Sequence, residues 1–153
     1  KQFTLLIQIR DLISSVHDTS SNISSIRLQV DEWIARAKAH DVEEGFFLQA
    51  EKIKAKLDSV ESCLVSANDG KNDKMNIPQQ LNAKLAELTF VVASADSPPT
   101  SQSYDVLSAL SARLATQLGK LQNIIDKDLP KFVERIHRID LPSISIGPSR
   151  NPL

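Results

Sequence analysis

Apolar side chains recur at spacings of three and four residues along almost the whole chain, the pattern of helices that bury one face. Four such stripes predict four helices, over about residues 3–39, 41–66, 78–94 and 101–139. Ser20 and Arg27 are the polar interruptions of the first stripe. Apart from the short run 143–146, no alternating stretch rich in β-branched residues lies between turn signals, so we expect no sheet.

Each stripe defines the side of its helix that we expect to be buried. The first stripe comprises Leu6, Ile9, Ile13, Val16, Ile23, Val30, Ile34 and Ala37. The second comprises Phe46, Ala50, Ile53, Leu57, Val60 and Leu64. The third comprises Leu81, Leu85, Leu88 and Val92. The fourth comprises Leu107, Leu110, Leu114, Leu118, Leu121, Ile125, Leu129, Phe132 and Ile136.

Capping residues and prolines indicate where the helices begin and end. Asp41 with Glu44 has the form of a capping box that opens the second helix, and Pro78 lies where a first-turn proline belongs. Pro130 removes a backbone hydrogen bond from the fourth helix and predicts a kink or break nearby. We expect residues 141–153, which contain three prolines, to form an extended tail.

Helices joined by short connections usually pack as antiparallel neighbours. The sequence therefore predicts one all-α domain over residues 1–140, arranged as an up-down-up-down antiparallel four-helix bundle with an extended proline-rich C-terminal tail. The length of 153 residues suits a single domain.

Composition narrows the classes of function. The 18 Lys and Arg side chains nearly balance the 19 Asp and Glu side chains, so a nucleic-acid-binding arm or a polybasic membrane anchor has no electrostatic basis. No apolar run approaches the roughly 18 residues that span a bilayer, so we expect no transmembrane segment in this chain. Cys63 is the one cysteine, so it cannot form a disulfide within the chain.

Few residues suggest chemistry. Glu134 and His137 have the Glu-x-x-His spacing of di-metal bundles, but no second copy exists, so we interpret them as part of a solvated face. Cys63 adjoins an apolar stripe and reads as a small inert side chain. The four glycines form no phosphate-binding or nucleophile motif. We predict no catalytic residue, no metal and no cofactor.

Two features are candidate partner contacts. Trp33, the only tryptophan, could anchor a partner, although a position flanking the core is the better interpretation. Lys131, Arg135 and Arg138, with His137, make the end of the fourth helix basic. They could form a patch for an acidic partner, but the helix dipole by itself favours cations there.

The chain begins at Lys1 with periodic sequence directly after it, so we expect a fragment of a longer protein. Several runs together resemble the C-terminal helical region that follows the Asp-box (BNR-repeat) β-propeller in bacterial proteins similar to sortilin (VPS10-type). They are LNAKL (81–85), VVASAD (91–96), Pro99-Thr100, Tyr104, LSARL (110–114) and DLPKF (128–132), with WIARA (33–37) compatible. Val133 departs from the pattern, where Asn is expected after the phenylalanine.

The resemblance implies a parent protein exported to the periplasm or cell surface, with any propeller chemistry outside this chain. It implies an architectural role for the motif residues, with Ser94 and Asp96 as helix terminators or caps, Pro99 as a rigid link and Thr100 as the start of the next helix.

Two hypotheses follow. The first is a non-catalytic helical-bundle module that docks on a neighbouring domain or a partner protein. The alternative is an enzyme, or a bundle that binds a ligand or cofactor between helices, with a pocket where Gly119 and Pro130 open the fourth helix. Converging buried polar groups around Glu134 and His137 would favour the alternative, and an apolar core there would oppose it.

Overall fold

The computed structural model describes residues 1–65 and 80–139. These residues form helices and short connections with no strand among them, so the prediction of an all-α chain is confirmed. The tail expected over 141–153 and the predicted first-turn Pro78 lie outside the described residues. In chain order, the elements are α1 Gln2–Lys38, α2 Glu44–Leu64, α3 Leu81–Ser94, α4 Ser101–Asn123, the π-helical turn η1 Ile124–Asp128, and α5 Leu129–Arg138.

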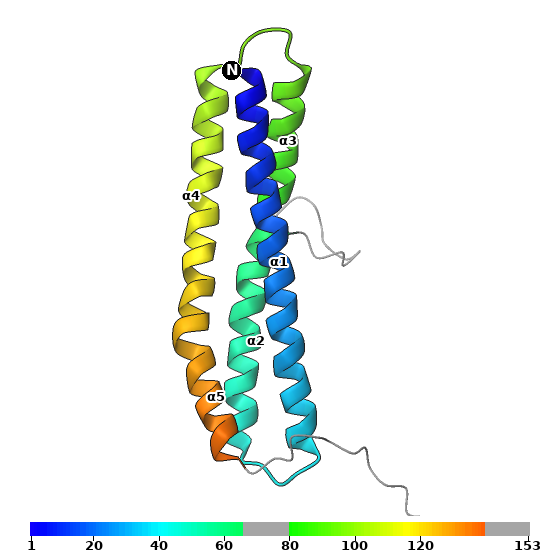
Figure 1. Ribbon diagram of the computed structural model, residues 1–153, viewed down its shortest axis with the longest axis vertical. Helices are drawn as coiled ribbons and strands as arrows, with labels where there is room; N and C mark the ends of the chain where they lie inside the picture. Colours follow the sequence, from blue (N-terminus) through cyan, green and yellow to red (C-terminus); the bar gives the residue numbers. More distant parts are fainter. Residues whose placement is uncertain (66–79, 140–153) are drawn as a thin grey trace, which may run out of the picture.

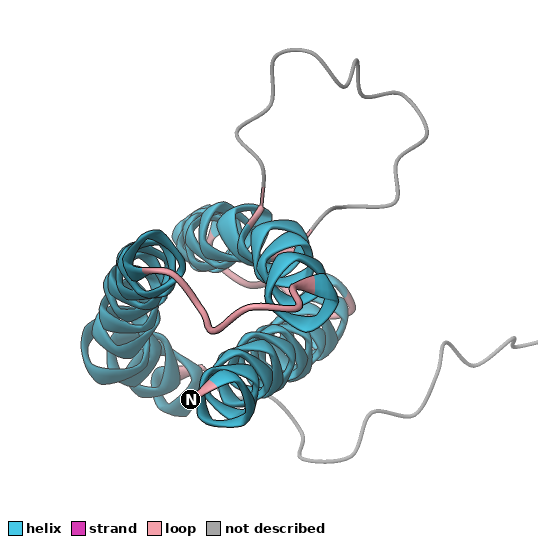
Figure 2. Ribbon diagram, turned by 90° about the horizontal axis from the view of Figure 1, so that it is seen from above, coloured by secondary structure: helices cyan, strands magenta, loops and turns pink. Residues whose placement is uncertain are grey.

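The helices form three long columns (Figure 1). One column is α1, another is α4 continued by η1 and α5, and the third is α2 followed end to end by α3. The 21 residues of α2 and the 14 of α3 together match the 37 residues of α1. Seen from above, the helices surround one central axis (Figure 2), as expected for apolar residues that repeat every seven positions.

Polar contacts show how α2 and α3 run relative to α1. At one end of the bundle, the Gln2 side-chain amide donates to the carbonyl oxygen of Val92 at 2.7 Å, which places the start of α1 beside the end of α3. Further along α1, the Arg27 guanidinium binds the Glu61 carboxylate of α2 at 2.7 Å. Both α2 and α3 are therefore antiparallel to α1, and they point the same way.

This arrangement differs from the predicted up-down-up-down bundle of four helices. In that bundle the third helix would reverse the direction of the second, whereas α3 continues in the direction of α2 (Figure 1). The physical reason is coverage: neither short helix alone can bury the apolar face of a 37-residue helix, and the two in line can.

One apolar core runs the length of the bundle. All ten stripe residues predicted for the second and third helices are buried, on α2 and α3 respectively. On α1, Leu5 is buried where Leu6 was expected, Ile13 is half-buried, and Thr19 also faces the core. On α4, the predicted stripe residue Leu118 is 36% exposed, while the neighbouring Gln117 is half-buried with its side-chain oxygen enclosed.

The capping predictions had different outcomes. Helix α2 begins at Glu44, is preceded by Glu43 at the cap position and has no side-chain cap, so the capping box of Asp41 and Glu44 was wrong. Residues 39–43 instead make the reversal between α1 and α2. At the other end, α3 ends at Ser94, and the Thr100 hydroxyl accepts a hydrogen bond from the Ser103 amide at the start of α4.

The break predicted near Pro130 is a π turn. The Leu129 amide donates to the Ile124 carbonyl, five residues earlier, instead of four. In a regular helix the ring of Pro130 would clash with the carbonyl of residue 126 and leave it unbonded. The extra residue rotates the following turn, so the buried position passes from Ile124 on η1 to Phe132 on α5.

Candidate functional site

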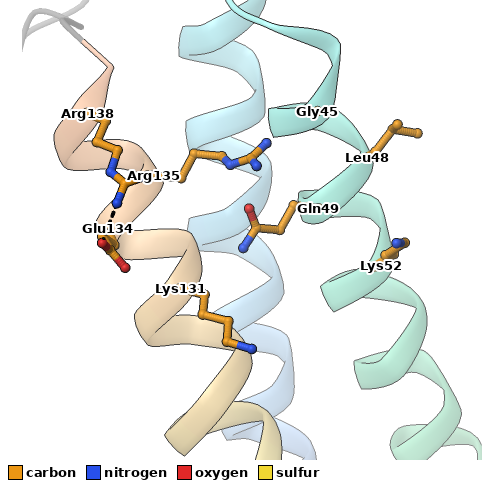
Figure 3. A pocket seen from close by; sticks show the side chains of 8 residues that line it. All are labelled: Gly45, Leu48, Gln49, Lys52, Lys131, Glu134, Arg135 and Arg138. Carbon is orange, nitrogen blue, oxygen red and sulfur yellow. Dashed lines mark hydrogen bonds and ion pairs between the residues drawn. The ribbon is translucent and has the colours of Figure 1, made fainter.

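A groove lies between the first half of α2 and α5. It encloses about 490 Å³ and is lined by Gly45, Leu48, Gln49, Lys52, Lys131, Glu134, Arg135 and Arg138. The side chains of Lys131 and Arg135 extend from α5 toward α2, while Gln49 extends from α2 toward α5 (Figure 3). Three of the four predicted partner contacts are thereby brought together with a fourth cation, Lys52. We refer to this feature as the basic groove.

Aromatic packing holds α5 against α2 beneath the groove. Phe132 of α5 is 2% exposed, and its ring stacks on that of Phe46 with centroids 5.1 Å apart. Phe46 also meets Phe47 edge to face at 5.6 Å. An ion pair of 2.9 Å between Lys56 and Asp128 adds a contact one turn further along. The cations therefore project from helices fixed by buried side chains.

The positive charge of the groove is only partly neutralised. Arg138 pairs with Glu134 at 2.6 Å along the same helix. Lys52, Lys131 and Arg135 form no ion pair with any residue in the described ranges. The lining thus carries four cations against one carboxylate.

Arg135 occupies space that only a glycine leaves free. A Cβ atom built on Gly45 would lie 2.7 Å from Nη1 of Arg135, closer than such atoms come to one another in real structures. Gly45 lies in the first turn of α2, where unpaired backbone amides give the helix end a partial positive charge. The guanidinium therefore adds its charge to an end of α2 that is already positive.

A second hollow lies on the other side of Arg135 and carries mixed charge. It encloses about 420 Å³, and its lining includes Asp41 and Glu43 together with Arg135 and Arg138. Arg135 and Arg138 thus line both hollows, whereas Lys52 and Lys131 line the basic groove and not this second hollow.

Trp33 lies apart from this site. It is half-buried and packs against the core, and the Arg36 guanidinium lies 4.9 Å from its ring centroid. The geometry corresponds to the core-flanking interpretation of this tryptophan.

The residues that would have supported an internal site do not converge. Glu134 and His137 are both exposed, and the buried residue between them and η1 is Phe132. Gly119 is exposed and has no atom within 4 Å of an added Cβ. Across the described ranges, no three His, Cys, Asp or Glu side chains gather as a metal site would require. Cys63 is half-buried at the end of α2.

A third hollow, of about 340 Å³, lies between α3 and α4 and is mainly apolar. Val91 and Val106 line it and are 56% and 39% exposed, with Lys84 and Glu87 at its edge. The helices that line it, α3 and the start of α4, lie toward the opposite end of the bundle from α5 (Figure 1).

Sequence reasoning missed the α2 side of the basic groove. Lys52, Gln49 and Leu48 lie outside the apolar stripe of their helix, and Leu48 is 57% exposed. A leucine outside the apolar stripe, followed four residues later by a lysine, was the weak signal in the sequence for a contact surface. The pairing with α5 became visible only through the fold.

Comparison of the chain with protein-family models, curated proteins and solved structures found no match. Within the described residues, no helix combines the length and the apolar character needed to cross a bilayer.

Proposed function

We propose that this chain is a non-catalytic helical-bundle module of a larger protein, which docks a partner protein or a neighbouring domain through the basic groove. The single observation that carries the proposal is the convergence of Lys52, Lys131 and Arg135, all without an ion-pair partner among the described residues. Charged groups at a surface steer association and fix its orientation.

The position of these residues supports docking over an internal site. The interior between the helices is filled by apolar side chains, and the cations lie on an open groove between two neighbouring helices. Such a groove presents a broad strip to a partner, whereas a small-molecule site encloses most of its ligand.

The context of the module is proposed from the sequence resemblance alone. A sortilin-like parent with an upstream Asp-box propeller would place the bundle in the periplasm or at the cell surface. In that setting the basic groove would face the propeller or a second exported protein.

Site-specific photo-crosslinking in the native host tests the proposal. A photoreactive phenylalanine replaces Leu48 at the rim of the groove, and the matched control carries it at Ala112, which is exposed on α4. We expect one discrete adduct from position 48, identified by mass spectrometry, and none from position 112. Equal adducts from both positions, or none from position 48, would refute docking through this groove.

A further inference from the structure

We propose that the basic groove binds an acidic, extended segment of a polypeptide, with two or more Asp or Glu side chains on Lys52, Lys131 and Arg135. This inference rests on the proposed docking function and specifies the chemistry of the partner. It is carried by charge complementarity, by the dimensions of the groove and by the space at Gly45.

The charge argument compares the groove with the rest of the bundle. Elsewhere on the described surface four cations pair with carboxylates across or along helices, whereas Lys52, Lys131 and Arg135 line one groove without an ion-pair partner among the described residues. Like charges on facing helices repel, and an anionic partner removes that repulsion on binding. The matched cations are Arg10, Arg27, Lys54 and Lys56.

The dimensions match a short stretch of extended chain. Lys131 and Arg138 are seven residues apart on α5, which corresponds to about 10 Å of helix. An extended peptide advances about 3.3 Å per residue, so three or four residues span the groove. Side chains at alternate positions of such a segment point the same way, so two carboxylates can face the cations together.

Arg135 is the central recognition group. Its planar guanidinium can donate two parallel hydrogen bonds to one carboxylate, a geometry that lysine lacks. Because Gly45 has no Cβ, the guanidinium rests against the first turn of α2 rather than extending into solvent. A carboxylate bound there would also face the positive end of α2.

The surrounding charges favour a short acidic peptide over a nucleic acid. Glu134 lies within the groove, and Asp41 and Glu43 line the adjoining hollow, so a long phosphate backbone would meet carboxylates on leaving the groove. Nucleic-acid binding also relies on many phosphate contacts at once, and the groove offers four cations in a chain with a net charge of −1.

Fluorescence anisotropy with the full 153-residue chain tests the inference. The probe is a fluorescein-labelled peptide of eight residues that alternates Glu and Ser, and the control probe replaces each Glu by Gln. We expect saturable binding of the Glu peptide at low salt, weakening as salt rises, and none of the Gln peptide. Equal binding of both probes would overturn the inference, as would no binding of the Glu peptide at low salt.

Variants then locate the binding site. Lys131→Gln combined with Arg135→Gln should weaken binding about tenfold, because two charge-assisted contacts are lost. The matched control, Lys84→Gln with Lys120→Gln, removes the same charge from α3 and α4 and should change affinity less than about twofold. Equal weakening by both double variants would mean that only net charge matters and would overturn the assignment.

Gly45→Ala provides a second, independent variant. It removes no charged side chain but displaces the Arg135 guanidinium, so the Glu peptide should bind more weakly while circular dichroism and the melting temperature show an intact fold. Unchanged affinity would refute the role given to Arg135 at this position.

The two proposals, docking through the groove and an acidic partner, can be refuted independently of each other. An adduct at position 48 without binding of the Glu peptide would keep the docking proposal and overturn the acidic partner. Peptide binding without an adduct would support anion recognition and overturn docking in the host. Displacement of the Glu peptide by an oligothymidine of equal charge at lower concentration would overturn the choice of a polypeptide.

Discussion

Replacing Phe132 by alanine should release α5 from the bundle. Phe132 is the only residue of α5 that is fully buried, and its ring stacks on Phe46 at 5.1 Å. Truncating a buried phenylalanine to alanine costs about 3–5 kcal/mol. The ring contact itself accounts for about 0.5–1.5 kcal/mol of this, which a double-mutant cycle with Phe46→Ala would measure as a coupling energy.

This loss of stability is large enough to detach α5 while the rest of the protein stays folded. Domains have total stabilities of about 5–15 kcal/mol, and an isolated helix of ten residues is too short to persist in water. We therefore expect the amides of Leu129–Arg138 to exchange almost without protection in Phe132→Ala, while those of α1 remain protected.

Urea unfolding and hydrogen exchange by mass spectrometry measure the two effects. The control is Val133→Ala, at the neighbouring position of α5, where the side chain is 46% exposed and the change should stay within about 0.5 kcal/mol. A loss below about 1 kcal/mol for Phe132→Ala, or unaltered exchange in α5, would refute the claim that this ring anchors the helix.

Three further substitutions test other parts of the bundle. Gln117→Leu should raise the free energy of unfolding by about 1 kcal/mol or more, because the enclosed side-chain oxygen has no hydrogen-bond partner among the described residues; a lower urea midpoint would contradict this. Gly119→Ala should add about 1 kcal/mol, because an added Cβ meets nothing within 4 Å, and an unchanged melting temperature would count against it. The hydrogen bond to Asp31 raises the pKa of Lys54 above 10.5, so its stabilisation is present below that pH and is lost as pH rises through the raised value. Wild-type stability should therefore fall more steeply than that of Lys54→Met in urea titrations above about pH 10.5, and parallel curves would refute the coupling.

The helices themselves were predictable because their apolar stripes are strong. The stripe from Phe46 to Leu64 and that from Leu81 to Val92 are buried as predicted. The direction of α3 was not predictable from those stripes, because periodicity fixes which face is buried and says nothing of which end of the bundle a connection reaches. The helix lengths explain the direction of α3, because only α2 and α3 placed end to end are long enough to cover α1.

The register of α4 was missed for a different reason. Leu118 fits the three-four spacing of the predicted stripe, yet strict seven-residue repetition from Leu110 points to Gln117. The helix keeps this repeat until η1, where the π turn inserts one residue ahead of Pro130. Where helices coil about one another, the seven-residue repeat therefore decides which position faces the core, even when a polar residue occupies that position.

The basic groove depends on the same packing that the Phe132 substitution would disturb. The cations of residues 131–138 were visible in the sequence, and the helix dipole alone accounts for cations at the end of a helix. Lys52 lies beside them only because α5 packs against α2. Undocking α5 would separate Lys52 from the other three cations without changing any charge. Phe132→Ala should therefore weaken binding of the acidic peptide although the substituted side chain is buried, which ties the recognition surface to the aromatic contact beneath it.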